Sequence, residues 1–150
     1  MEIADLIASV LESKSSELWT TTPENTVFDA IEQMSEKNVG ALPVIEGDKL
    51  VGIVSERDYT RKVILKGKSS KETTVRNIMT TGLITITTRD SVVKSLQTMT
   101  DNRVRHLPVL NNEKIIIGIV TIGDLVKWMI SAQRAMIDQL EGYIRGSYPA

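Results

Sequence analysis

Apolar residues in the first third of the chain follow a helical spacing and then change to short, continuous runs. The helical spacing covers four positions on one face: Val27, Ala30, Ile31 and Met34. Thr26 precedes them, and its hydroxyl can accept a hydrogen bond from a free backbone N–H at the helix start. An apolar run at residues 41–45, a polar turn at 46–49 and a second apolar run ending at Ser55 predict a β-hairpin. A further helix is expected to open near Asp58.

The same order of elements recurs later in the chain. The offset is 65 residues up to Ile115 and 66 residues after it. Ser91 takes the place of Thr26, and apolar runs at 107–110 and 115–121 enclose a polar turn. Helical spacing recurs at Val92, Ser95, Leu96 and Met99. Residues 26–58 share eleven identities with the later copy: Val27/Val92, Met34/Met99, Val39/Val104, Leu42/Leu107, Pro43/Pro108, Val44/Val109, Lys49/Lys114, Gly52/Gly118, Ile53/Ile119, Val54/Val120 and Asp58/Asp124. We interpret these ordered identities as an internal duplication.

Each copy is a unit of strand, helix, hairpin and helix. A unit of about 60 residues buries too little apolar surface to be stable alone, so we expect the two to pack face to face. This predicts an α/β (α+β) fold of tandem β-α-β-β-α repeats with pseudo-twofold symmetry and a cleft between them. The expected division is an N-terminal helix at 1–15, a first repeat at 16–66, a linker at 67–74, a second repeat at 75–130 and a C-terminal helical extension at 131–150.

The flanking segments carry amphipathic patterns of their own. The first combines Ile3, Leu6, Ile7, Val10 and Leu11, and residues 75–79 suggest a short helical turn before the second repeat. The last is a long stripe: Leu125, Trp128, Met129, Ala132, Met136, Ile137, Leu140 and Ile144. A helix of that length with an apolar stripe is a candidate contact for a homodimer.

Composition narrows the function classes. The chain has 150 residues, no cysteine and a formal net charge of −1, so disulfides, thiolate chemistry and a global basic field are excluded. Nucleic-acid binding through Arg103, Arg105 and Lys114 is therefore disfavoured. The start of the chain lacks a signal-peptide pattern, and the apolar runs fall far short of the roughly 20 residues needed to span a bilayer. We expect a soluble, cytoplasmic protein with no membrane association.

A hydroxyl residue and an aspartate three positions later follow the second strand of each copy. These pairs are Ser55 with Asp58 and Thr121 with Asp124. A carboxylate suits a ribose diol, and a hydroxyl with free helix-start amides suits a phosphate, to which Arg57 adds a forked cation. The same spacing also fits an ordinary helix-capping arrangement. Its presence in both copies, facing one cleft, favours a binding function.

A basic cluster precedes the first strand of the second hairpin. Arg103, Arg105 and the only histidine, His106, stand where the first copy has Asn38, Gly40 and Ala41. Since small or neutral residues suffice there for folding, the cluster suggests a phosphate site. Catalysis finds no support: the histidine has no nucleophile beside it, and metal-ligand spacing and a phosphate-binding glycine loop are absent from the sequence.

The duplicated motifs resemble the CBS domain pair, also called a Bateman module, and in particular stand-alone bacterial proteins with two CBS repeats. The matching segments are 40–44 with 52–58, and 106–109 with 118–124, and the resemblance extends from about Ser16 to Met129. It implies a regulatory module, not an enzyme, that binds AMP, ADP, ATP, NAD or S-adenosylmethionine without a required metal.

The resemblance also implies two sites. One would combine Thr121, Gly123 and Asp124 with Trp19, Val39, Gly40 and Ala41. The other would combine Ser55, Arg57 and Asp58 with Ile84, Val104, Arg105 and His106. Because the first motif has Arg57 where the second has Gly123, the two sites are expected to differ in affinity or ligand. We expect a nucleotide sensor that signals to an unknown downstream protein; the alternative is an interaction or dimerisation scaffold without a physiological nucleotide.

Overall fold

The computed structural model describes residues 5–14 and 17–145. In the first repeat, α2 (Val27–Lys37) begins where the Thr26 hydroxyl accepts a hydrogen bond from Asp29 N at 3.1 Å. Strands β1 (Ala41–Glu46) and β2 (Lys49–Ser55) form the predicted antiparallel hairpin, and Gly47 supplies the positive φ of its turn. A short helix, α3 (Glu56–Tyr59), continues as the π-helical turn η2 (Thr60–Ile64).

The second repeat has the same order of elements. Helix α5 (Val92–Asn102) is capped by Ser91, and β4 (His106–Leu110) pairs antiparallel with β5 (Ile116–Thr121). A two-residue strand, β3 (Ile86–Thr87), adds to β4 in parallel, whereas the first repeat has only a parallel bridge between Thr21 and Val44. The long helix α6 (Ile122–Ile144) closes the chain. The predicted α/β class with tandem repeats is therefore confirmed.

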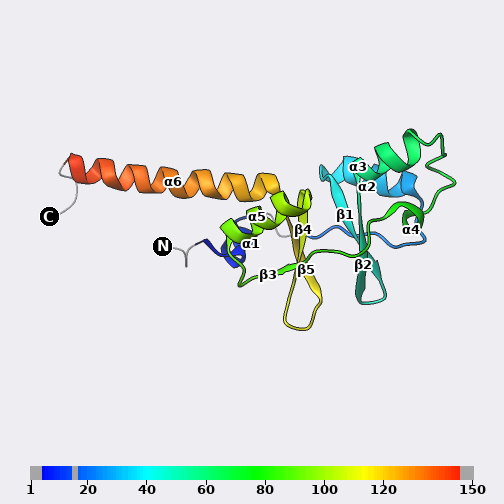
Figure 1. Cartoon of the computed structure of the whole chain (residues 1–150), viewed down its shortest axis with the longest axis horizontal. Coiled ribbons are helices and arrows are strands. Elements are labelled where there is room, and N and C mark those ends of the chain that lie inside the picture. Colours follow the sequence, from blue (N-terminus) through cyan, green and yellow to red (C-terminus); the bar gives the residue numbers. More distant parts are fainter. Residues whose placement is uncertain (1–4, 15–16, 146–150) are drawn as a thin grey trace.

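Each repeat has its own apolar core. The helix before each repeat in the sequence packs into the core of the other repeat. Helix α1 (Ile7–Ser13) stands first in the sequence, yet Ile7 and Val10 are buried in the core of the second repeat. The short helix α4 (Val75–Ile78) packs into the core of the first repeat. Figure 1 shows the two hairpins side by side, with α1 beside α5 and α4 beyond β2. Of the predicted first helix, Ile3 lies outside the described residues.

Gly52 and Gly118, identical in the two copies, mark where these helices approach the hairpins. A side chain at Gly52 would come within 2.7 Å of Met79 Sδ, just after α4. A side chain at Gly118 would come within 2.9 Å of Leu11 in α1. Glycine is present in both copies because each hairpin is covered closely by a neighbouring segment.

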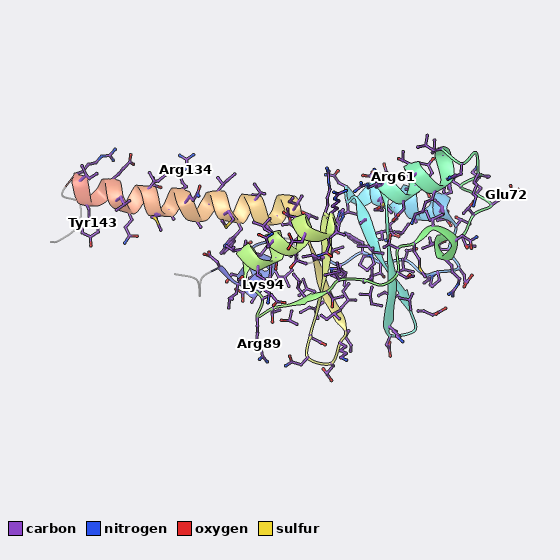
Figure 2. All side chains as sticks on the ribbon, in the orientation of Figure 1. Arg61, Glu72, Arg89, Lys94, Arg134 and Tyr143 are labelled. Carbon is purple, nitrogen blue, oxygen red and sulfur yellow. The ribbon has the colours of Figure 1, made fainter. Side chains whose placement is uncertain are left out.

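Helix α6 begins on the body and then leaves it. Leu125 is fully buried, and the first turns of α6 contact α1 and α5. The remainder projects outward, and Arg134 and Tyr143 lie along this projecting part (Figure 1, Figure 2). Among the described residues, no helix combines the length and apolar character required to cross a membrane.

Candidate functional site

A cavity of about 750 Å³ opens between the two repeats. One wall comes from the end of β2 with α3 and η2, and the other from residues 80–84 and the start of β4. Its volume lies within the range of roughly 300–1,000 Å³ typical of small-molecule sites. Eight of the predicted nucleotide-binding residues line it: Gly40, and all seven of the group Ser55, Arg57, Asp58, Ile84, Val104, Arg105 and His106. The structure thus brings together one complete predicted group.

Asp58 is the buried polar centre of this cavity. Its Oδ2 accepts hydrogen bonds from Ser55 N and Ser55 Oγ, both at 3.0 Å, while Ser55 Oγ accepts one from Asp58 N at 3.1 Å. The capping arrangement left open by the sequence is therefore formed. Asp58 Oδ1 lies 3.0 Å from Lys62 Nζ and accepts a 3.4 Å hydrogen bond from Thr80 Oγ1. Because the same carboxylate also lines the cavity, capping fixes its orientation for a ligand.

Positive charge dominates the cavity wall. Five permanent cations line it: Arg57, Arg61, Lys62, Arg103 and Arg105. Only two carboxylates do so, Glu56 and Asp58, and the second is paired with Lys62. Guanidinium groups bind phosphate oxygens in pairs, so this wall is suited to a phosphorylated ligand.

Arg103 occupies a backbone position that does not favour arginine. It ends α5 in the left-handed conformation with φ of 56°, as Asn38 ends α2 with the same φ. Asparagine tolerates this conformation better than most other side chains. Local backbone preference therefore does not account for Arg103, which lies in the cavity wall.

His106 stands at the first residue of β4. Burial is the main cause that lowers the pKa of its imidazole, Lys14 and Arg105 act in the same direction, and Asp124 opposes them. Its Nε2 would lie 3.6 Å from a Cβ added at Gly40. The glycine on the facing repeat therefore leaves the room that the imidazole fills.

The other predicted group is not assembled around this cavity. Of its members only Gly40 lines it. Trp19 and Val39 pack against the core of the first repeat, where Lys37 Nζ lies 4.2 Å from the centre of the Trp19 ring, and Ala41 is buried. Gly123 lies in the first turn of α6, beside Thr121 and Asp124.

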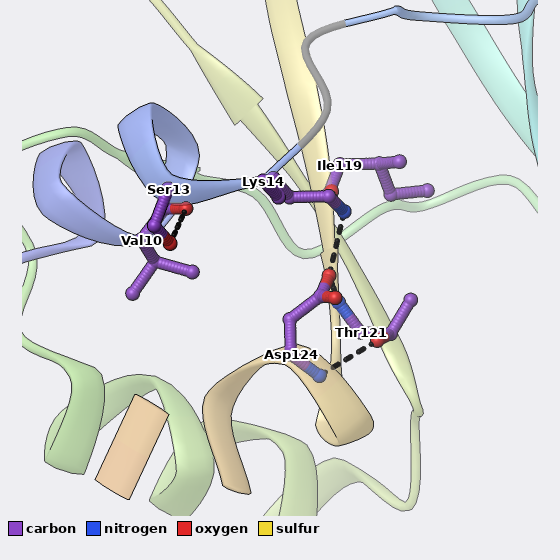
Figure 3. Close-up of polar contacts among 6 residues, drawn as sticks. All are labelled: Val10, Ser13, Lys14, Ile119, Thr121 and Asp124. Atoms are coloured by element: carbon purple, nitrogen blue, oxygen red, sulfur yellow. Dashed lines mark hydrogen bonds and ion pairs between the residues drawn. The ribbon is translucent and has the colours of Figure 1, made fainter. Parts of the chain in front are cut away.

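Thr121 and Asp124 form a capping box like that of the first repeat. Asp124 N donates to Thr121 Oγ1 at 3.0 Å, and Thr121 N donates to Asp124 Oδ2 at 2.9 Å. The contrast lies in the neighbour: Lys14 Nζ is 2.6 Å from Asp124 Oδ2 (Figure 3). A cation from the start of the chain thus contacts the second motif aspartate.

Several lining residues were missed by reasoning from the sequence. Arg61 and Lys62 lie one helical turn beyond Arg57 and Asp58, so helical spacing could have indicated them. Thr80 and Gly82 belong to the connection between repeats, and no local pattern marks them. Lys14 is also unmarked, because its partner is 110 residues away. In the described part of the chain, no group of three or more histidine, aspartate or glutamate residues is placed to hold a metal ion.

Comparisons with known proteins agree with the fold. The CBS domain family profile matches residues 8–64 and 75–131. The chain is 45% identical to the Arabidopsis thaliana CBS domain-containing protein CBSX3, mitochondrial, over 95% of this chain and 73% of that protein. A solved CBS-domain protein from Burkholderia ambifaria MC40-6 is 44% identical, with a TM-score of 0.82 over 85% of this chain and 96% of that one.

A more distant structure shares the fold alone. The CBS domain pair of protein MJ0100, solved in complex with 5′-methylthioadenosine and S-adenosyl-L-methionine, has a TM-score of 0.75 at 23% identity. The match covers 85% of this chain and 97% of that one. The paired family matches, the duplicated hairpins and the structural similarity lead to one conclusion: this chain belongs to the CBS domain family and consists of a CBS domain pair.

Proposed function

We propose that this protein is a sensor of adenine nucleotides, which bind in the cavity beside Asp58. One observation carries the proposal. The cavity has a carboxylate and a hydroxyl suited to a ribose, Asp58 and Ser55, on one repeat, and cations from both repeats around the same space. The adenosine-containing ligands bound by the MJ0100 pair support this class of ligand.

The phosphate groups would set the preference within that class. Cations outnumber carboxylates on the wall by five to two, so each added phosphate gains a further charge-assisted contact. We therefore expect ATP, ADP and NAD to bind more tightly than AMP, and AMP more tightly than adenosine. S-adenosylmethionine, which lacks phosphate and carries a positive sulfonium, should bind weakly.

Binding would produce a signal because the cavity walls belong to different repeats. Arg57 comes from the first repeat and Arg105 from the second, so one ligand holding both fixes the angle between the repeats. A ligand shifts such an equilibrium only by its difference in affinity between the two arrangements. CBS pairs are generally regulatory modules, and a downstream protein would recognise the ligand-bound arrangement.

Isothermal titration calorimetry with AMP, ADP, ATP, NAD, adenosine and S-adenosylmethionine tests this proposal. We expect saturable binding that is tightest for ATP, ADP and NAD, weaker for AMP, weaker again for adenosine, and weak for S-adenosylmethionine. Asp58→Asn should lose roughly ten- to one-hundredfold in affinity, as expected for a charged hydrogen-bond acceptor. Asp48→Asn is the matched control, since Asp48 is exposed in the β1–β2 turn. The proposal fails if none of these compounds gives heat or a thermal shift, or if both variants bind like the parent.

The projecting half of α6 favours a homodimer. Exposed apolar residues follow a four-three spacing there: Val126, Ile130, Ile137, Leu140 and Ile144, with Gln133 in the remaining position. This is the seam of a helix pair, with isoleucine and leucine in the positions that favour two strands. A second copy presents the same seam, so we propose that two chains associate through α6.

Light scattering after size exclusion tests the dimer. The parent should have twice the chain mass, and a double variant, Ile137→Glu with Leu140→Glu, should be monomeric. Ala135→Glu changes the opposite face of the helix and should remain dimeric. A monomeric parent, or a dimeric double variant, would contradict the proposal. Loss of partner binding on deletion of residues 131–150, together with no nucleotide binding, would favour the alternative of a scaffold.

A further inference from the structure

The second motif aspartate already has a cation against it. Lys14 Nζ lies 2.6 Å from Asp124 Oδ2 and donates to Ile119 O at 2.9 Å (Figure 3). The same Oδ2 accepts a hydrogen bond from Thr121 N. One ammonium therefore joins β5 to the first turn of α6, at the place where a ligand of Asp124 would have to bind.

The backbone of Lys14 is held by α1, which it directly follows. Ile7 and Val10 of this helix are 0% and 2% exposed, and Ile7 N donates to Asp90 O at 2.9 Å. Leu11 lies over Gly118 in β5. The side chains of the ion pair are only 29% and 24% exposed for Lys14 and Asp124. The contact therefore depends on a buried helix and differs from a pair of two mobile surface side chains.

The first repeat has no equivalent cation from this segment. Met79 lies over Gly52 as Leu11 lies over Gly118; Lys14 is the third residue after Leu11, whereas the three residues after Met79 (Thr80, Thr81 and Gly82) are uncharged. Asp58 pairs instead with Lys62, one turn further along its own helical segment, whose side chain is 44% exposed. Lys62 Nζ also donates to Ile78 O at 2.9 Å, but its more exposed side chain belongs to the cavity wall, so it can turn toward a ligand phosphate without leaving the site.

We propose that Lys14 closes the Asp124 site, so that the chain binds one nucleotide at Asp58 and a second only when Lys14 is displaced. The inference rests on the proposed function of the Asp58 cavity. A ribose hydroxyl would have to share Asp124 with an ammonium that α1 holds in place, whereas the more exposed Lys62 can turn away from Asp58 within its cavity. Helix α1 is then a latch, and any event that lifts it from the second repeat adds a second binding site.

Calorimetry with ATP on the full chain tests the latch through its stoichiometry. The parent should bind one ATP per chain, and Lys14→Met, which removes the ammonium and keeps an unbranched side chain, should bind two. Lys14→Arg should remain at one because it keeps the ion pair, and the double variant Lys14→Met with Asp124→Asn should return to one. Lys66→Met removes the same charge from an exposed position and serves as the control.

The outcomes separate this inference from the proposed function. One ATP in both the parent and Lys14→Met overturns the latch and leaves the Asp58 site standing. No ATP in the parent, with one in Lys14→Met that Asp124→Asn abolishes, supports the latch and contradicts the Asp58 site. Two ATP in the parent, or none in either chain, overturns the latch. Circular dichroism of each variant verifies that it is folded.

Discussion

Asp58 and Asp124 make the same local contacts in different surroundings. Each accepts a hydrogen bond from the backbone N–H three positions earlier and completes a capping box with a hydroxyl residue. Beyond that shared geometry, each aspartate pairs with a lysine: Asp58 and Lys62 line a cavity formed by both repeats, whereas Lys14, the partner of Asp124, comes from the end of α1. Duplication copied the motif, but the segment that supplies its lysine partner differs between the two repeats.

Met79 and Thr80 cover the first hairpin more tightly than Leu11 covers the second. This difference gives the largest expected effect on stability. A methyl group at Gly52 would meet Met79 Sδ at 2.7 Å and the backbone oxygen of Thr80 at 3.0 Å, while one at Gly118 would meet only the Leu11 side chain. Since backbone cannot turn aside, Gly52→Ala should lower the free energy of unfolding by about 2–3 kcal/mol and Gly118→Ala by about 1 kcal/mol. Urea denaturation measures both, and an equal or reversed order would show that the two segments are equally adaptable.

Substitution of Arg105 tests whether the cavity beside Asp58 binds the phosphate groups of a nucleotide. Arg105→Ala should weaken ATP binding about tenfold, the loss expected for one charge-assisted contact, and should weaken adenosine binding much less. Arg89→Ala removes an arginine far from the cavity and should change neither (Figure 2). Equal losses for ATP and adenosine in Arg105→Ala would place the side chain away from the phosphates.

His106 interacts electrostatically with Asp124 and predicts a pH dependence of stability. Burial lowers the pKa of the folded imidazole below the ordinary 6.5, so the unfolded chain takes up a proton before the folded one does. The contribution is complete above pH 6.5 and is lost as the pH falls through the folded value. Unfolding followed between pH 7.5 and 5.5 should therefore show a smaller decrease for His106→Gln than for the parent. A parallel decrease in both proteins would exclude the histidine as the cause.

The two lysine–aspartate pairs give the smallest effect. Lys62 is partly exposed and one helical turn from Asp58, so Lys62→Met should cost about 0.3–0.5 kcal/mol of stability. Lys14→Met breaks a less exposed pair between distant segments and should cost roughly 1 kcal/mol. Thermal unfolding of the two variants gives the ranking. Equal costs would mean that the anchoring of α1 adds nothing to the Lys14 contact.

Much of the fold is predictable from local patterns. Identical residues at Met34 and Met99, and at Leu42 and Leu107, are fully buried in the two cores, as their periodic spacing indicates. The helix starts at Thr26 and Ser91 follow from their hydroxyl residues. Such features depend on residues three or four positions apart. At that separation the helix geometry alone determines which side chains are neighbours, so the sequence suffices to identify them.

Tertiary packing decided the rest. The chain alone defined two hydroxyl–aspartate motifs and a basic cluster, and both motifs formed as local capping boxes. That α1 crosses to the second repeat, that Lys14 meets an aspartate 110 residues later, and that Arg57 and Arg105 face one cavity depend on how the two cores dock. No spacing along the chain encodes those contacts, because burial of apolar faces brings the segments together and only then do their charges meet.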